Sequence, residues 1–172
     1  MVNLNTNKLD SSYYLNGNHS HLSNNSTNVC DKSNDFTIFH QNMRGISHKI
    51  DELLISLTPN TPHVLCLTEH HLRTNEISLV NLGQYTLGAH FCRQTHKQGG
   101  VCIYISNDIQ FNIINLDQFN REKDLEICAV NIHLPPNSIA VICLYRSPTG
   151  NFNYFLNQLE YALNKTHSTS ST

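Results

Sequence analysis

The chain has 172 residues and a formal net charge of −2 with histidine neutral, which suits one domain and shows no overall basic field pointing to nucleic acid. The apolar fraction is 39%, and the first 35 residues account for much of the deficit. No apolar run approaches the roughly 20 residues of a membrane span, and the N-terminus lacks the basic and apolar regions of a secretory signal.

Most of the six cysteines lie where a small apolar side chain is expected. Cys66, Cys102, Cys128 and Cys143 are inside apolar runs typical of strands. An even cysteine count permits a disulfide framework. We nevertheless interpret these residues as reduced thiols of an intracellular protein, nuclear or cytoplasmic, that is neither secreted nor membrane-bound.

The composition divides the chain into three parts. Residues 1–35 are dense in Asn, Ser and Thr, show no sustained period, and are predicted to be a disordered N-terminal tail. Residues 36–165 carry the apolar patterns of a folded domain. Residues 166–172 are predicted to be a polar C-terminal end.

The first half of the domain has the pattern strand, helix, strand. Residues 36–42 alternate in polarity, as a strand does. Apolar residues then recur at helical spacing after Ser47, a candidate N-cap, and the sequence TPN at 58–60 ends the helix. Residues 64–68 form a continuous apolar run, typical of a strand covered on both faces. This order predicts a right-handed parallel crossover that brings Asn42 and Glu69 to one sheet edge.

The second half is richer in strands. Residues 74–83 fit either a short helix or a loop, and we leave both open. Strands are predicted at 85–92, 101–106, 109–116, 125–134 and 139–145, and an amphipathic helix at 151–164. The predicted class is α/β or α+β with mixed sheets.

Three predicted strand ends carry groups that suit phosphodiester chemistry. Glu69 offers an oxygen ligand of the kind that Mg²⁺ takes once or twice, leaving its other positions to water and phosphate. Asn42 can hold a metal-bound water or orient that carboxylate. Tyr145 can donate to a phosphate oxygen, and Arg146 is a planar cation suited to phosphate. Together they outline half of a metal-assisted phosphodiester site.

Three of these residues also have an ordinary structural explanation. Asn42 suits a turn before Gly45, Glu69 suits a solvated strand end, and Arg146 suits a surface position before a Ser-Pro turn. Only their joint occurrence at strand ends favours a site. A zinc site at Cys66, His70 and His71 is disfavoured, because no paired Cys-x-x-Cys or His-x3-His spacing supplies four ligands.

Five segments in order resemble the endonuclease/exonuclease/phosphatase superfamily, and more closely the endonuclease domain of non-long-terminal-repeat retrotransposons. They are FHQNMRGI, VLCLTEHHL, GGVCIYIS, LEICAVNI and VICLYRSPTGNFNYFLNQLE. The resemblance spans about residues 36–164. It implies the first half of a four-layered α/β sandwich, with mixed β-sheets flanked by helices, and hydrolysis of DNA with Mg²⁺ or Mn²⁺.

The resemblance also implies roles for individual residues. Asn42 and Glu69 would lie at the metal as catalytic residues, and Tyr145 would lie beside the scissile phosphate. Arg146 would bind phosphate next to it. Arg93, followed by Gly99-Gly100, matches the Arg and Gly-Gly that the family carries before a hairpin strand, and would contact the nucleic acid.

The sequence departs from the family pattern after the Tyr-Arg-Ser-Pro segment. The Gly-Asp-Phe-Asn and Ser-Asp-His motifs that supply the remaining metal, nucleophile and acid/base groups are absent from these 172 residues. We therefore expect an N-terminal fragment of an endonuclease domain that is inactive as it stands and binds metal weakly or not at all. The alternative is a non-catalytic interaction module. In either case we expect self-association through an uncovered sheet face.

Overall fold

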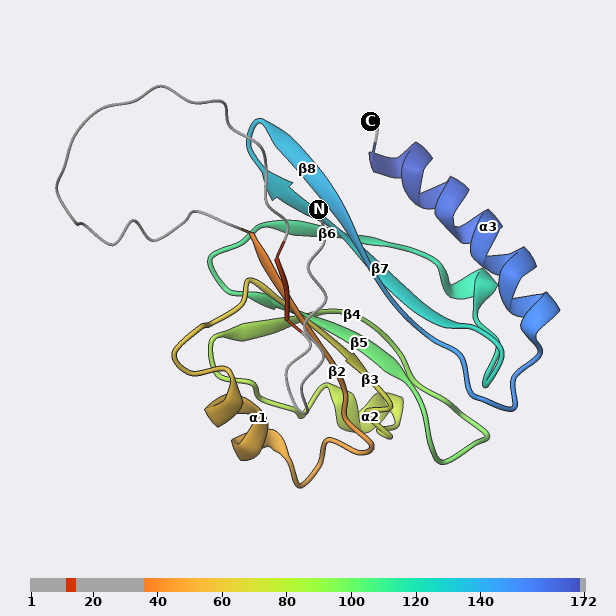
Figure 1. The fold of residues 1–172 in the computed structure, drawn as a ribbon, viewed down its shortest axis with the longest axis horizontal. Coiled ribbons are helices and arrows are strands. Elements are labelled where there is room, and N and C mark those ends of the chain that lie inside the picture. The colour runs from red at the N-terminus through yellow and green to blue at the C-terminus, as the bar shows by residue number, and fades with distance from the viewer. Residues whose placement is uncertain (1–11, 15–35, 171–172) are drawn as a thin grey trace, which may run out of the picture.

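The computed structural model describes residues 12–14 and 36–170. They form two β-sheets packed face to face, with helices on both outer sides (Figure 1). The elements in chain order are β1 Ser12–Tyr14, β2 Thr37–Asn42, α1 Ile50–Ser56, β3 Val64–Thr68, α2 Thr74–Ile77, β4 Tyr85–Phe91, β5 Val101–Ser106, β6 Phe111–Ile114, the short 3-10 helix η1 Asp117–Phe119, β7 Glu126–Leu134, β8 Asn137–Tyr145 and α3 Phe152–Ser170.

The first sheet confirms the parallel crossover. Its strand order is β1-β2-β3-β5-β4, and β2 and β3 are parallel, with Asn42 opposite Thr68. The other pairs in this sheet are antiparallel. The second sheet is an antiparallel meander, β6-β7-β8.

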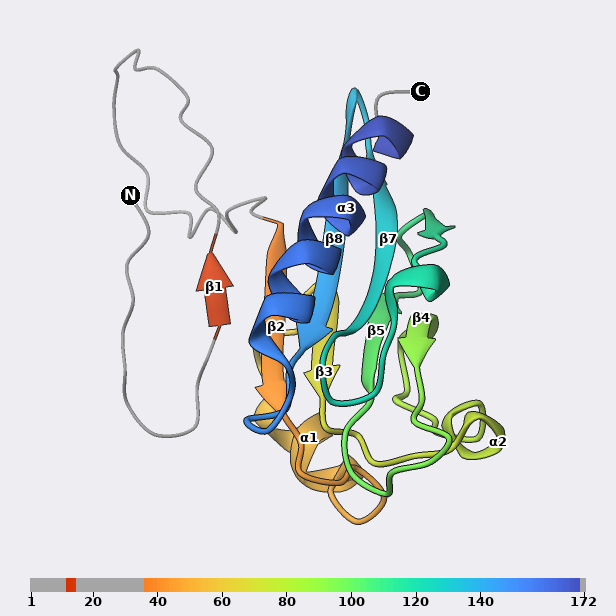
Figure 2. The same cartoon turned by 90° about the vertical axis from the view of Figure 1, so that its right-hand side faces the viewer.

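Alternating side chains on the strands build three apolar layers. On β3, Leu65 and Leu67 face α1 and α2, whereas Val64 and Cys66 face the second sheet. Strand β7 alternates likewise, and its Ile127 packs under α3. Figure 2 shows α3 lying across β7 and β8. The order is therefore helices, sheet, sheet, helix, which confirms the predicted class of a partial four-layered α/β sandwich.

The first helix begins later than predicted. Ser47 is not its cap, because α1 starts after Lys49, which makes no side-chain capping bond. The preceding residues are held elsewhere. The amide of Gly45 donates to the carbonyl of Glu69 at 2.8 Å, and Lys49 Nζ donates to the carbonyl of Met43 at 2.6 Å. The helix can start only once the chain has left this turn.

The last helix is longer than predicted, and a short strand lies ahead of the predicted folded domain. Residues 166–170, predicted as a polar end, continue α3, and the buried Thr166 donates its hydroxyl to the carbonyl of Ala162 at 2.9 Å. The predicted tail at 1–35 lies outside the described residues except for Ser12–Tyr14. There the structure has a strand that pairs antiparallel with β2, which a composition argument does not find.

Strand limits in the second sheet also shift. Strand β6 is shorter than predicted because Leu116 caps the 3-10 helix η1, while β8 begins at Asn137, which pairs with Leu134 across a tight turn. Strand β8 pairs only with β7 among the described residues. The predicted self-association of this region stays a prediction. No helix in the described ranges is long and apolar enough to cross a membrane.

Candidate functional site

The loops after β2 and β3 place Asn42 and Glu69 side by side at one sheet edge, as predicted. Asn42 ends β2 opposite Thr68, and Glu69 follows at once. Glu69 has a φ of +52°, a region that non-glycine residues seldom adopt and that costs on the order of 1–3 kcal/mol. This backbone turns the chain at the end of β3 and fixes the direction of the carboxylate.

A tyrosine from the second sheet completes the cluster. Tyr145, the last residue of β8, lies close to the Glu69 carboxylate, and so does the Asn42 side chain, since both lower the pKa of Glu69. The Asn42 Oδ1 accepts the backbone amide of Arg44 at 3.2 Å, which leaves the amide nitrogen to donate to Glu69. Asn42 and Tyr145, two of the predicted catalytic residues, therefore meet at the carboxylate of the third, Glu69.

The surroundings of Glu69 favour its charged form. Partial burial raises the pKa of this carboxyl group. Hydrogen bonds from Tyr145 and Asn42, with the charges of His71 and Arg44, outweigh that effect, so the pKa lies below its usual value. The side chain is 21% exposed. Glu69 thus presents a deprotonated carboxylate within reach of solvent.

The pKa of Tyr145 is shifted upward, whereas that of Glu69 is shifted downward. Burial and the neighbouring Glu69 carboxylate raise its pKa to about 12, although Arg93 opposes the shift. Tyr145 is therefore a neutral hydroxyl donor near neutral pH. A phenol held in this way can steady a carboxylate or a phosphate oxygen, but it does not serve as a base.

The two histidines after Glu69 play different parts. His71 Nε2 lies 3.8 Å from Glu69 Oε2, beyond hydrogen-bond distance, and burial lowers the pKa of His71. His70 is fully buried. Its Nδ1 accepts the amide of Leu72 at 3.0 Å, so its Nε2 carries the proton and faces the carbonyl of Phe91 at 3.1 Å. Burial lowers the pKa of His70 to about 4. His70 is a neutral structural residue.

Glu69 fits a hard divalent cation better than it fits zinc. Mg²⁺ commonly binds to one or two carboxylates and fills its remaining positions with water and phosphate. The Asn42 oxygen is occupied by the amide of Arg44, so Asn42 is placed to orient the carboxylate. No three His, Cys, Asp or Glu side chains gather as metal ligands within residues 12–14 and 36–170. Cys66 lies in the core between the sheets.

Arg93 is buried and paired within the fold, and its predicted contact with nucleic acid stays a prediction. It is 7% exposed, and its Nε donates to Glu126 Oε1 at 2.6 Å. Glu126 is fully buried and also accepts the amides of Gly100 at 2.6 Å and Lys123 at 2.9 Å. Sequence reasoning missed Glu126. The one available signal was an acidic residue at the start of an apolar strand.

Arg146 is held by its own turn. Its Nη1 donates to the carbonyls of Ser147 at 3.1 Å and Gly150 at 3.0 Å, and its guanidinium lies 5.5 Å from the Phe152 ring centroid. These contacts show that Arg146 stabilises the turn before α3. Its predicted phosphate contact stays a prediction.

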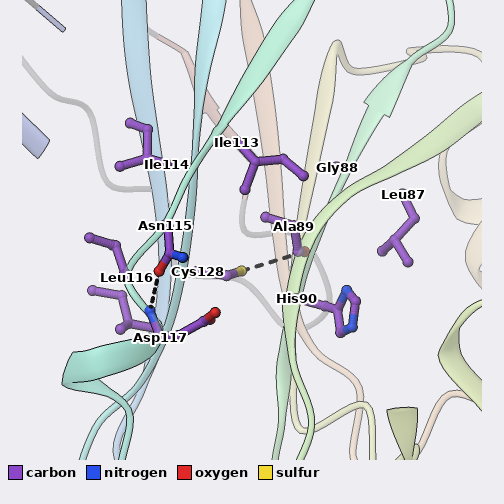
Figure 3. A pocket seen from close by; sticks show the side chains of 11 residues that line it. Leu87, Gly88, Ala89, His90, Ile113, Ile114, Asn115, Leu116, Asp117 and Cys128 are labelled. Carbon is purple, nitrogen blue, oxygen red and sulfur yellow. Dashed lines mark hydrogen bonds between the residues drawn. The ribbon is translucent and has the colours of Figure 1, made fainter. Parts of the chain in front are cut away.

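A cavity of about 340 Å³ lies away from these groups. Figure 3 shows it between β4, which contributes Leu87 to His90, and the segment from Ile113 to Asp117. None of Asn42, Glu69 and Tyr145 lines it. The candidate site therefore lies at a sheet edge, apart from this pocket.

Glu122 organises the loop between β4 and β5 beside the site. Its carboxylate accepts the amides of Thr95 at 2.8 Å and His96 at 2.9 Å, together with that of Gln94. Burial raises the pKa of Glu122, but these amides and the His96 side chain outweigh it and lower the pKa to about 2. The ordered loop therefore depends on the charged carboxylate.

We predict that Glu122→Gln weakens the acid sensitivity of folding. The folded pKa lies below the unfolded value of about 4.3, so this stabilisation is complete above the unfolded value and is lost as pH falls toward 2. The free energy of unfolding, measured by urea titration at pH 7 and pH 3.5, should differ less in Glu122→Gln than in the parent. Equal differences in the two chains would contradict the assignment.

Comparison with solved structures identifies the fold. Over a part of its length, the chain shares its fold with solved structures that are 13–15% identical to it. It resembles the "Endonuclease domain of TRAS1, a telomere-specific non-LTR retrotransposon", with a TM-score of 0.56 and 13% identity, covering 73% of this chain and 52% of that one.

Two further neighbours are crystal structures of one protein from D. rerio, TDP2. A humanized form with 14 mutations matches at a TM-score of 0.51 and 14% identity, covering 74% of this chain and 58% of that one. The complex with single strand DNA product matches at 0.52 and 15%, covering 74% and 53%. This chain thus spans about half the length of these neighbours. No family model and no curated protein matches it.

Proposed function

We propose that this chain provides the Glu69 half of a divalent-metal-dependent DNA endonuclease site of the retrotransposon type. The observation that carries the proposal is the convergence of Asn42 and Tyr145 on one charged carboxylate at a sheet edge. The fold supports it, since a retrotransposon endonuclease domain and a structure holding a single-stranded DNA product share that fold.

The residues have separable tasks in this proposal. Glu69 would hold Mg²⁺ or Mn²⁺, which would supply charge neutralisation at the phosphate. Asn42 orients the carboxylate, and Tyr145 donates a hydrogen bond to it and to an incoming phosphate oxygen. Nicking DNA in this way exposes a 3′ hydroxyl that a reverse transcriptase can extend.

A single carboxylate is not a complete hydrolytic site. In-line attack also needs an oriented water and a group that takes its proton. Within the described part of the chain, Glu69 belongs to no cluster of three His, Cys, Asp or Glu side chains, and His71, 3.8 Å away, has a lowered pKa. We therefore propose that these 172 residues bind metal weakly and do not cleave DNA without the groups of a complete domain.

Metal binding offers the direct test. Paramagnetic Mn²⁺ should broaden the NMR signals of Asn42, Glu69 and Tyr145 first, and excess Mg²⁺ should reverse the effect. Glu69→Gln should abolish the broadening, whereas Glu52→Gln, on the exposed face of α1, should leave it unchanged. Broadening that persists in Glu69→Gln would contradict the proposed metal site.

The non-catalytic alternative rests on exposed apolar surface. Helix α3 exposes Phe152, Leu156, Tyr161 and Leu163, each between 47% and 61%. A folded chain that does not bind Mn²⁺ but binds a partner through these residues would favour the interaction module. An intracellular location belongs to the first proposal, and the five described cysteines, all unpaired and buried, agree with a reducing compartment.

A further inference from the structure

A buried ion pair lies directly behind the tyrosine of the candidate site. We propose that Glu126 and Arg93 are positioning residues that hold Tyr145 so that its hydroxyl stays on Glu69. The inference rests on the proposed function of Glu69 and Tyr145, and it replaces nucleic-acid contact as the task of Arg93.

Glu126 is built into the fold as a charged anchor. It has no exposed surface, and it accepts hydrogen bonds from Arg93, from the amide of Gly100 and from the amide of Lys123. Its ion pair with Arg93 is short. A buried carboxylate is tolerated only when its oxygens are satisfied in this way. Glu126 can therefore reach neither solvent nor a substrate, and it acts through its partners.

The register of the second sheet connects this anchor to the site. Glu126 on β7 lies directly opposite Tyr145 on β8. The Arg93 guanidinium, fixed by Glu126, sits 6.0 Å from the Tyr145 ring centroid, within the range of a cation–π contact. The Tyr145 hydroxyl then reaches Glu69 in the other sheet. The phenol is thus held at its ring by Arg93 and at its hydroxyl by Glu69.

The two glycines before β5 make room for this arrangement. A Cβ on Gly99 would lie 2.2 Å from Arg93 Nε, and Gly99 has a φ of +116°. Any larger residue there would displace the guanidinium from Glu126. The chain therefore reserves space for Arg93 inside the fold. The Arg93 guanidinium pairs there with Glu126. The positive charge of Arg93 faces the ring of Tyr145.

The test follows Tyr145 itself in the full-length chain. The protein is labelled with 3-fluorotyrosine, and the ¹⁹F signal of Tyr145 is assigned with Tyr145→Phe. Arg93→Gln should move this signal more than that of any other tyrosine. The matched control is Arg121→Gln, because Arg121 lies over the ring of Tyr154 at 3.4 Å. It should move the Tyr154 signal and leave Tyr145 in place.

Comparing single and double variants shows whether Arg93 and Glu126 act on Tyr145 together or independently. Glu126→Gln alone should move the Tyr145 signal, and it should add nothing further when Arg93 is already Gln. If a single variant unfolds because one buried charge remains, Arg93→Lys keeps the charge, loses the planar fork and should still move the signal. A Tyr145 signal that is unchanged in folded Arg93→Lys overturns the inference.

A second readout links the pair to the site. The Glu69 pKa, followed by the ¹³C shift of its carboxyl group, should rise in Tyr145→Phe and rise partly in Arg93→Lys, while Arg121→Lys leaves it unchanged. An unmoved Glu69 pKa in Arg93→Lys overturns the inference. Neither NMR readout needs metal or DNA. Loss of the Mn²⁺ effect at Glu69 would sink the proposed function while leaving these shifts intact.

Discussion

A chimera that supplies the second half of the sandwich should nick supercoiled plasmid in Mg²⁺, whereas the 172-residue chain alone should not. The chimera joins this chain to the part of the TRAS1 endonuclease domain that follows its matched region. Each missing acid/base or electrostatic group costs about 10²- to 10⁴-fold in rate, so the chain alone should show no nicking above background. The structure also sets the junction: α3 continues to Ser170, so a fusion at Asn164 would cut the helix.

Glu69→Gln in the chimera should lower the nicking rate by at least about 10²-fold, since the metal loses its carboxylate. Glu52→Gln should leave the rate unchanged, because Glu52 is exposed on α1. Metal-dependent nicking by the chain alone, abolished by Glu69→Gln, would show that it needs no further groups. A folded but inactive chimera would undermine the assignment of Asn42, Glu69 and Tyr145.

The parallel pair β2 and β3 of the first sheet was predictable because its sequence signals are local, whereas β1 at the edge of the same sheet was not. The unbroken apolar run at 64–68 indicates a strand covered on both faces, and all five residues are buried. Parallel pairing with β2 follows from the helix between the strands. Since parallel strands end at the same edge, the proximity of Asn42 and Glu69 follows from the sequence pattern alone.

The contribution of the second sheet was not predictable by the same route. Tyr145 reaches Glu69 only because the two sheets pack face to face, and nothing in the sequence around either residue encodes that packing. The resemblance to a known family supplied it. For Arg146 the resemblance gave a phosphate contact, while the structure shows its guanidinium on the carbonyls of Ser147 and Gly150.

The ion pair behind Tyr145 is the clearest case of missing sequence signal. Arg93 and Glu126 are separated by 33 positions, and each looks like an ordinary polar residue at the boundary of a strand. A buried charge is recognisable only when its partner is known. The sequence shows Gly99 and Gly100 as a motif. The structure explains them, because the side chains of Arg93 and His70 occupy the space that a Cβ would need.

Gly100→Ala should lower the free energy of unfolding by about 2–5 kcal/mol. Gly100 has a φ of +87°, which strains any other residue. A Cβ there would lie 2.4 Å from Nε2 of His70. His70 cannot move aside, because it is fully buried and both ring nitrogens are engaged.

Gly83→Ala is the matched control for this prediction, because it isolates the backbone cost from the collision. Gly83 also has a positive φ, +64°, but a Cβ there would meet nothing within 4 Å. It should cost only about 1 kcal/mol in the same urea titration. His70→Ala should remove the collision, so that adding Gly100→Ala to it costs no more than Gly83→Ala does. Equal losses for the two single glycine variants would mean that His70 moves aside. The buried histidine would then not fix the loop whose Gly100 amide donates to Glu126.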